Sequence, residues 1–109
     1  MSSDRILRMP TGEVISIVST GAETAGALFE FEGLVPPGVN GPPAHIHRVE
    51  QESFEVREGV LRVRLGSRHR DLGPGETVVV QPGTVHAFSN PTDRPTRIVV
   101  RETPAGQLE

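Results

Sequence analysis

Apolar and polar side chains alternate in short segments along this chain of 109 residues. The clearest case is residues 60–65, where Leu61, Val63 and Leu65 alternate with Arg62 and Arg64. Since successive side chains of a strand point to opposite faces, this alternation predicts a strand with one buried face. Similar alternating or β-branched segments predict further strands at residues 14–18, 27–31, 53–57, 77–80, 85–88 and 97–101.

Turn-forming residues separate these segments at short intervals. They include Glu58-Gly59, Gly73-Pro74-Gly75, Pro82-Gly83 and Asn90-Pro91. No stretch of helical length has a clear apolar stripe with a period of 3.6 residues. Short strands with regular turns favour an all-β sandwich or barrel, and the length fits a single domain over residues 1–109.

Composition excludes several kinds of chemistry. The chain has no Cys, Trp or Tyr, and its eleven basic residues are all Arg. Disulfides, thiolate nucleophiles, sulfur-ligated zinc, a Schiff-base lysine and a tyrosine acid are therefore excluded. The net charge of −3 and the absence of a basic cluster argue against nucleic acid as a partner. We see no signal peptide and no apolar run long enough to span a membrane, so we expect a soluble, cytoplasmic protein.

Three histidines and a glutamate form the candidate site. They are His45, His47, Glu52 and His86, and together they could complete most of the shell of a divalent transition metal. If each pair lies on a strand, His45 shares a face with His47, and Glu52 shares one with Phe54. Burying four ionisable groups beside apolar walls is costly, and a metal ion would remove that cost. Glu50 is the alternative carboxylate ligand.

At these residues the sequence resembles the cupin superfamily, in particular its small single-domain members. The first cupin motif, G-x5-H-x-H-x(3,4)-E-x6-G, fits His45, His47, Glu52 and Gly59, while its leading glycine is displaced to Gly38. This spacing selects Glu52 over Glu50, which would then be a solvated loop residue.

The second motif, G-x5-P-x-G-x2-H-x3-N, fits Gly75, Gly83, His86 and Asn90, with the proline displaced by one place to Pro82. The resemblance covers residues 27–100. It implies a jelly-roll, double-stranded β-helix barrel that holds one metal at His45, His47, Glu52 and His86. The donors suit Mn, Fe, Co, Ni, Cu or Zn and do not choose among them.

Other residues have weaker indications. Glu52 is the best candidate for a general base, because the motifs offer no other acid or base. Phe88, Phe31 and Phe54 are candidates for a substrate pocket, although each could simply fill the core. His69 stands in a charged run and is interpreted as a surface residue rather than a fifth ligand. The outward-facing arginines Arg57, Arg62 and Arg64 oppose Glu55 and Glu58 in the pattern and are interpreted as a cross-strand ladder of charges.

The resemblance implies three possible functions. The first is a small enzyme that activates an organic substrate at the metal, with dioxygenase-like chemistry as in the quercetin-dioxygenase-like cupins. The second is a non-redox isomerase, lyase or cyclase, and the third is a non-catalytic binder of small molecules. A small-molecule ligand and a homodimer are expected in each case.

Overall fold

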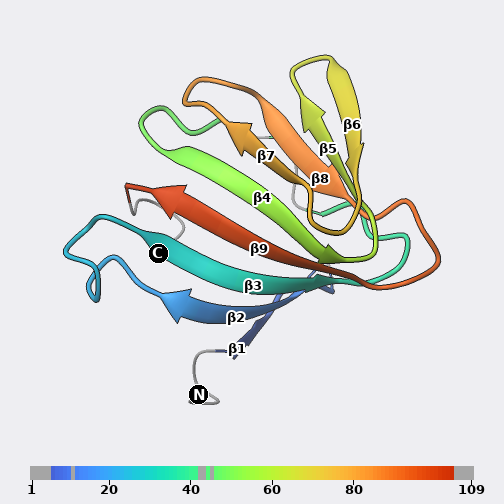
Figure 1. Cartoon of the computed structure of the whole chain (residues 1–109), viewed down its shortest axis with the longest axis horizontal. Coiled ribbons are helices and arrows are strands. Elements are labelled where there is room, and N and C mark those ends of the chain that lie inside the picture. Colours follow the sequence, from blue (N-terminus) through green and yellow to red (C-terminus); the bar gives the residue numbers. More distant parts are fainter. Residues whose placement is uncertain (1–5, 11, 42–43, 45, 105–109) are drawn as a thin grey trace.

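The computed structural model describes residues 6–10, 12–41, 44 and 46–104 (Figure 1). Within these residues the regular secondary structure is entirely strand, and no helix there is long and apolar enough to cross a membrane. The strands are β1 (Ile6–Arg8), β2 (Val14–Ser19), β3 (Phe29–Val35), β4 (Gln51–Glu58), β5 (Leu61–Leu65), β6 (Arg68–Leu72), β7 (Thr77–Val80), β8 (His86–Ser89) and β9 (Thr96–Thr103).

Two antiparallel sheets make up the fold. The larger has six strands in the order β1-β2-β3-β9-β4-β7, and the smaller has three in the order β6-β5-β8. In Figure 1 the red strand β9 lies between β3 and β4, although it comes last in the sequence. The predicted all-β class is confirmed, and this arrangement is the double-stranded β-helix of the jelly-roll type.

The core lies between the sheets and follows the predicted alternation. On β5 the side chains of Leu61 and Val63 are fully buried, whereas Arg62 and Arg64 are exposed. On β4 the buried residues are Glu52, Phe54 and Val56, which therefore share the inner face. The period of two thus places a carboxylate among apolar side chains, as the sequence predicted.

Two strands were missed and one was misplaced. β6 contains the charged run that includes His69, and only Leu72 at its end is buried, so no alternation marks it. β1 is short and fully exposed. The strand predicted at residues 27–31 runs instead from Phe29 to Val35, because β2 and β9 both pair with it along that length.

The segment before β4 corrects a second expectation. We expected His47 to lie on a strand, but Ile46–Glu50 has no regular strand structure. Six prolines and glycines precede it within residues 36–43, and prolines cannot donate the hydrogen bonds of a sheet ladder. The argument that neighbouring strand positions share a face therefore does not apply to His47.

Candidate metal centre

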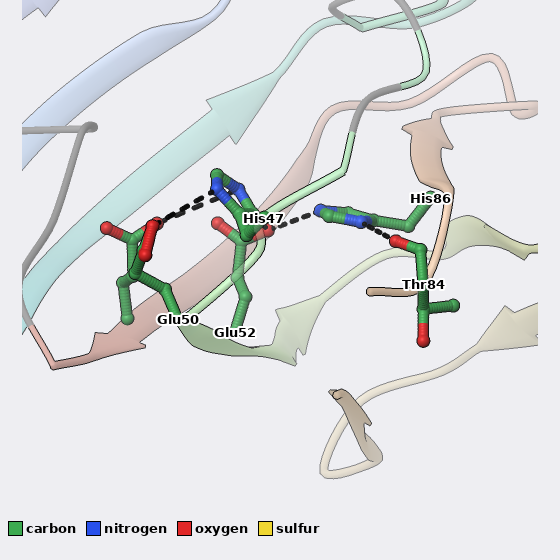
Figure 2. Close-up of polar contacts among 6 residues, drawn as sticks. His47, Glu50, Glu52, Thr84 and His86 are labelled. Atoms are coloured by element: carbon green, nitrogen blue, oxygen red, sulfur yellow. Dashed lines mark hydrogen bonds and ion pairs between the residues drawn. The ribbon is translucent and has the colours of Figure 1, made fainter. Parts of the chain in front are cut away.

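The candidate site lies between the two sheets. His47, Glu52 and His86 each offer a ligand atom there, and these atoms all lie within 4.8 Å of one another (Figure 2). Glu52 belongs to the larger sheet through β4, whereas His86 begins β8 of the smaller sheet. All three side chains are buried, with exposed fractions of 7% for His47, 3% for Glu52 and 1% for His86.

A hydrogen bond between the sheets links two of these residues. Nε2 of His86 lies 2.8 Å from Oε1 of Glu52, and Nδ1 of His86 lies 2.9 Å from the carbonyl oxygen of Thr84. A carbonyl oxygen can only accept a hydrogen bond, so Nδ1 carries a proton and donates it to Thr84. This contact fixes the imidazole and presents Nε2 to the interior, which is how metal-binding histidines are commonly held.

The surroundings of His86 shift its pKa in opposing directions. Burial disfavours the charged imidazolium and by itself lowers the pKa. The hydrogen bonds to Glu52 and to the carbonyl of Thr84 outweigh burial, and the negative charges of Glu52 and Glu102 add to them. The pKa of His86 therefore lies above its ordinary value in the metal-free protein, because the interior is rich in negative charge.

His47 is surrounded by three carboxylates. Its Nε2 lies 3.7 Å from Oε1 of Glu52 and 3.7 Å from Oε2 of Glu102, and its Nδ1 lies 4.0 Å from Oε1 of Glu50. Its backbone is tied to the second motif, since the N–H of Gly83 donates a 2.7 Å hydrogen bond to the carbonyl of His47. Gly83 has a φ of +86°, a conformation that favours glycine.

These donors fit a divalent metal ion. Two donor atoms bound to one ion at about 2.1 Å lie about 3.0 to 4.2 Å apart, depending on the angle between them. The separation of 3.7 Å between His47 and Glu52 falls in this range, whereas the 2.8 Å between His86 and Glu52 must lengthen slightly. Imidazole and carboxylate donors without sulfur suit first-row transition metals.

The structure describes three of the four predicted metal ligands. The structure brings together His47, Glu52 and His86, while His45 lies outside the described residues. Glu50 corrects an expectation: it is buried and contacts His47, and is not a solvated loop residue. His69 is exposed on β6, in agreement with its interpretation as a surface residue.

Glu102 was not among the predicted site residues. The predicted strand ends at residue 101, one residue before Glu102. Its side chain is in fact fully buried at the end of β9 and contacts His47. The period of two could have found it, because Ile98, Val100 and Glu102 fall on one face of a strand.

An apolar cavity of about 110 Å³ adjoins the site. Phe31, Phe54 and Phe88, the three predicted pocket residues, all line it, and Glu52 lines it as well. The rings of Phe54 and Phe88 are 5.7 Å apart, and Phe54 also packs against His86 at 6.3 Å between ring centroids. Buried Glu13 is a further carboxylate in the lining. The structure therefore places the three phenylalanines beside the candidate site.

Several known proteins are similar to this chain in sequence or in fold. Over residues 31–101 the sequence matches the profile of the cupin domain family. A curated relative, the "probable oxidoreductase virH" of Hypocrea virens, is 35% identical over 63 residues. That match covers 56% of this chain and 29% of the relative, so the chain spans less than a third of the relative's length.

Solved structures agree with the sequence match. An RmlC-like cupin from Shewanella frigidimarina superposes with a TM-score of 0.81 at 17% identity, covering 98% of this chain and 91% of that one. A recombinant oxalate oxidase in complex with glycolate has a TM-score of 0.73 at 25% identity, covering 88% of this chain and 53% of that one. By its sequence match and by its fold, the chain belongs to the cupin domain family.

Proposed function

We propose that this protein is a metal-dependent enzyme that performs dioxygenase-like oxidation of a small organic substrate. The observation that carries the proposal is the position of Glu52, which belongs both to the buried His/Glu group and to the wall of the apolar cavity. A molecule in this cavity therefore lies next to the candidate metal ligands. His47, Glu52 and His86 would hold the ion, together with His45, whose role rests on the motif alone.

Each described residue has a distinct task in this proposal. Phe31, Phe54 and Phe88 bind the apolar part of the substrate and exclude water from the site. A carboxylate oxygen of Glu52 accepts a proton from the substrate, which makes Glu52 the general base. Thr84 keeps the proton of His86 on Nδ1, so that Nε2 stays directed at the site. When bound, the metal supplies Lewis acidity and, if it is redox-active, electron transfer.

The volume of the cavity limits the substrate. Binding sites for drug-sized ligands typically measure about 300 to 1,000 Å³. The 110 Å³ found here therefore encloses a small apolar group rather than a whole large molecule. We propose that one ring or a short apolar chain enters, with an oxygen-bearing carbon facing Glu52.

The relatives favour redox chemistry over isomerisation. The curated relative virH is described as a probable oxidoreductase, and a similar solved structure is an oxalate oxidase. The lack of Lys and Tyr in this chain further disfavours non-redox routes that need a second acid or base.

The test is an oxygen-consumption assay of the protein reconstituted separately with Fe(II), Mn(II), Ni(II), Cu(II) and Zn(II). The panel consists of flavonols, β-diketones and catechols, and products are identified by mass spectrometry. We expect oxygen uptake with a redox-active metal and none with Zn(II). Uptake should fall at least about 100-fold in Phe88→Asp, which puts a charge into the apolar wall, without a matching loss of metal.

Two outcomes contradict the proposal. Conversion of a panel compound with Zn(II) in the absence of oxygen would replace it by non-redox catalysis. Tight binding of a compound that is recovered unchanged with every metal would replace it by a binding function.

The homodimer and the cytoplasmic location remain predictions. Sedimentation equilibrium at micromolar concentration tests the first, and a mass of 11.8 kDa would contradict it.

A further inference from the structure

Glu52 and Glu102 are direct neighbours across two strands of the larger sheet. In the register of β4 with β9, Glu52 pairs with Glu102, and the row continues to Val80 on β7 and to Phe29 on β3. All four side chains are buried. Two carboxylates thus stand side by side in a row whose other members are apolar.

This pairing is unfavourable unless a positive charge compensates it. Opposed residues of antiparallel strands have their Cβ atoms about 4.5 to 5.5 Å apart, and like charges at that spacing destabilise the sheet. Burial raises the cost, since a carboxylate in a low-dielectric interior needs a partner of opposite charge. The sequence nevertheless places a carboxylate at both positions.

The nearest arginine along β9 does not supply that charge. Arg101 precedes Glu102 and therefore points to the opposite face of the sheet. There it pairs with Glu55, 3.1 Å away, and with Glu30, 3.5 Å away. The imidazole of His47 is a basic group close to the Glu102 carboxylate, with 3.7 Å between Oε2 and Nε2.

Glu102 and Glu52 approach the same atom of His47. Both lie 3.7 Å from Nε2, the nitrogen that faces the candidate metal site, whereas Glu50 lies near Nδ1. A separation of 3.7 Å is within the range of about 3.0 to 4.2 Å expected for two donors of one ion. Glu102 lies outside the group of His47, Glu52 and His86, whose ligand atoms are all within 4.8 Å of one another, so its carboxylate must move toward the other donors when an ion binds.

We propose that Glu102 is a second carboxylate ligand of the metal centre and binds the ion beside His47. Two carboxylates then balance the charge of a divalent ion, which removes the cost of pairing Glu52 with Glu102. A second oxygen donor shifts the preference of the site toward harder ions such as Mn(II), Fe(II) and Co(II) and away from Cu(II). This inference rests on the metal site of the proposed function.

The experiment compares metal binding by the wild-type protein and by Glu102→Gln, which keeps the shape and removes the charge. Dissociation constants for Mn(II), Co(II) and Zn(II) are measured by competition with a chromophoric chelator, and melting temperatures are recorded with and without each ion. We expect Glu102→Gln to bind the ions at least about tenfold more weakly. The metal-free variant should melt at the same temperature as the metal-free wild type or higher, because a repulsive buried pair has gone.

Glu55→Gln is the matched control. It removes the same charge from β4 but on the outer face, so its dissociation constants should stay within about twofold of wild type. If Glu102→Gln does not fold, Glu102→Met replaces it, because Met has a similar length and carries neither the charge nor an oxygen donor. A wild-type dissociation constant in the variant used would overturn the role of Glu102 alone. Failure of the wild-type protein to bind any of the ions would overturn the metal site itself, and this inference with it.

Discussion

The interior of the barrel and the outer face of the smaller sheet carry the same kinds of ionisable side chain in opposite surroundings. Inside, two histidines and the carboxylates of Glu50, Glu52 and Glu102 are buried together. Outside, Arg62 and Asp71 face each other across β5 and β6, with two N–O contacts of 2.8 and 3.1 Å. His69 lies on the same exposed strand. One region concentrates negative charge, whereas the other balances it pair by pair.

The difference indicates where function resides. Exposed ion pairs contribute little to stability, because water and salt screen them. A buried group of carboxylates is costly unless a positive charge compensates it. The interior is therefore the region whose charges we expect to respond to a metal, whereas the outer pairs should respond only to pH and salt.

Removal of the metal should have the largest effect. An ion present at about 1,000 times its dissociation constant stabilises the folded state by about 4 kcal/mol. For a chain of this size we expect EDTA to lower the melting temperature by more than about 10 °C, measured by calorimetry. Sodium chloride at matched ionic strength should not reproduce this loss. Equal melting temperatures with and without the ion would mean that the interior charges do not need it.

Truncation of a side chain in the wall of the apolar cavity should have the next largest effect on stability. It should also separate the contribution of packing from that of metal binding. Phe88→Ala removes a ring that packs on Phe54, and we expect it to cost about 2 to 4 kcal/mol of unfolding free energy, measured by urea denaturation. Its metal content should remain that of wild type, since Phe88 is not a ligand. A parallel loss of metal would contradict this separation. It would show that the apolar cavity and the buried histidines and glutamates form a single unit.

A substitution on the outer face of the smaller sheet should have the smallest effect on stability. The hydrogen bond from Arg62, the largest of the influences on the Asp71 carboxyl, lowers its pKa. A lowered pKa in the folded state means that the pair stabilises the protein above the unfolded pKa of about 3.9 and loses this contribution as the pH falls through the folded value. Asp71→Asn should therefore change the melting temperature by at most about 2 °C at pH 7, and less at pH 3. A larger change, or one that 0.5 M salt leaves intact, would contradict the assignment of this face to solvent.

Much of the fold could be predicted because one face of each central strand is buried. Alternation at Leu61 and Val63 on β5, and at Phe54 and Val56 on β4, marks the core directly. β6 escaped prediction because four of its five residues are exposed, so apolar residues are not required there. The ladder of outward charges was partly misjudged for the same reason: Arg62 pairs with Asp71 of β6 and not with an acidic residue of β4.

The spacing of residues in the two motifs predicted only part of the candidate site. His47, Glu52 and His86 fall in two motifs, and the structure brings them together. Glu102 lies sixteen residues after His86 and outside both motifs, and only the pairing of β4 with β9 places it beside Glu52. Glu50 escaped as well, because its burial depends on the path of the irregular segment that Gly83 holds in place.

The most direct test of the central claim is elemental analysis of the protein purified without added metal or chelator, with His86→Ala and His69→Ala beside it. These variants remove the same side chain from the interior and from the outer face. We predict close to one transition-metal ion per chain in the wild-type protein and in His69→Ala, and a loss of most of it in His86→Ala. Equal metal content in all three proteins, or a greater loss in His69→Ala, would contradict the assignment of the metal centre to the buried group.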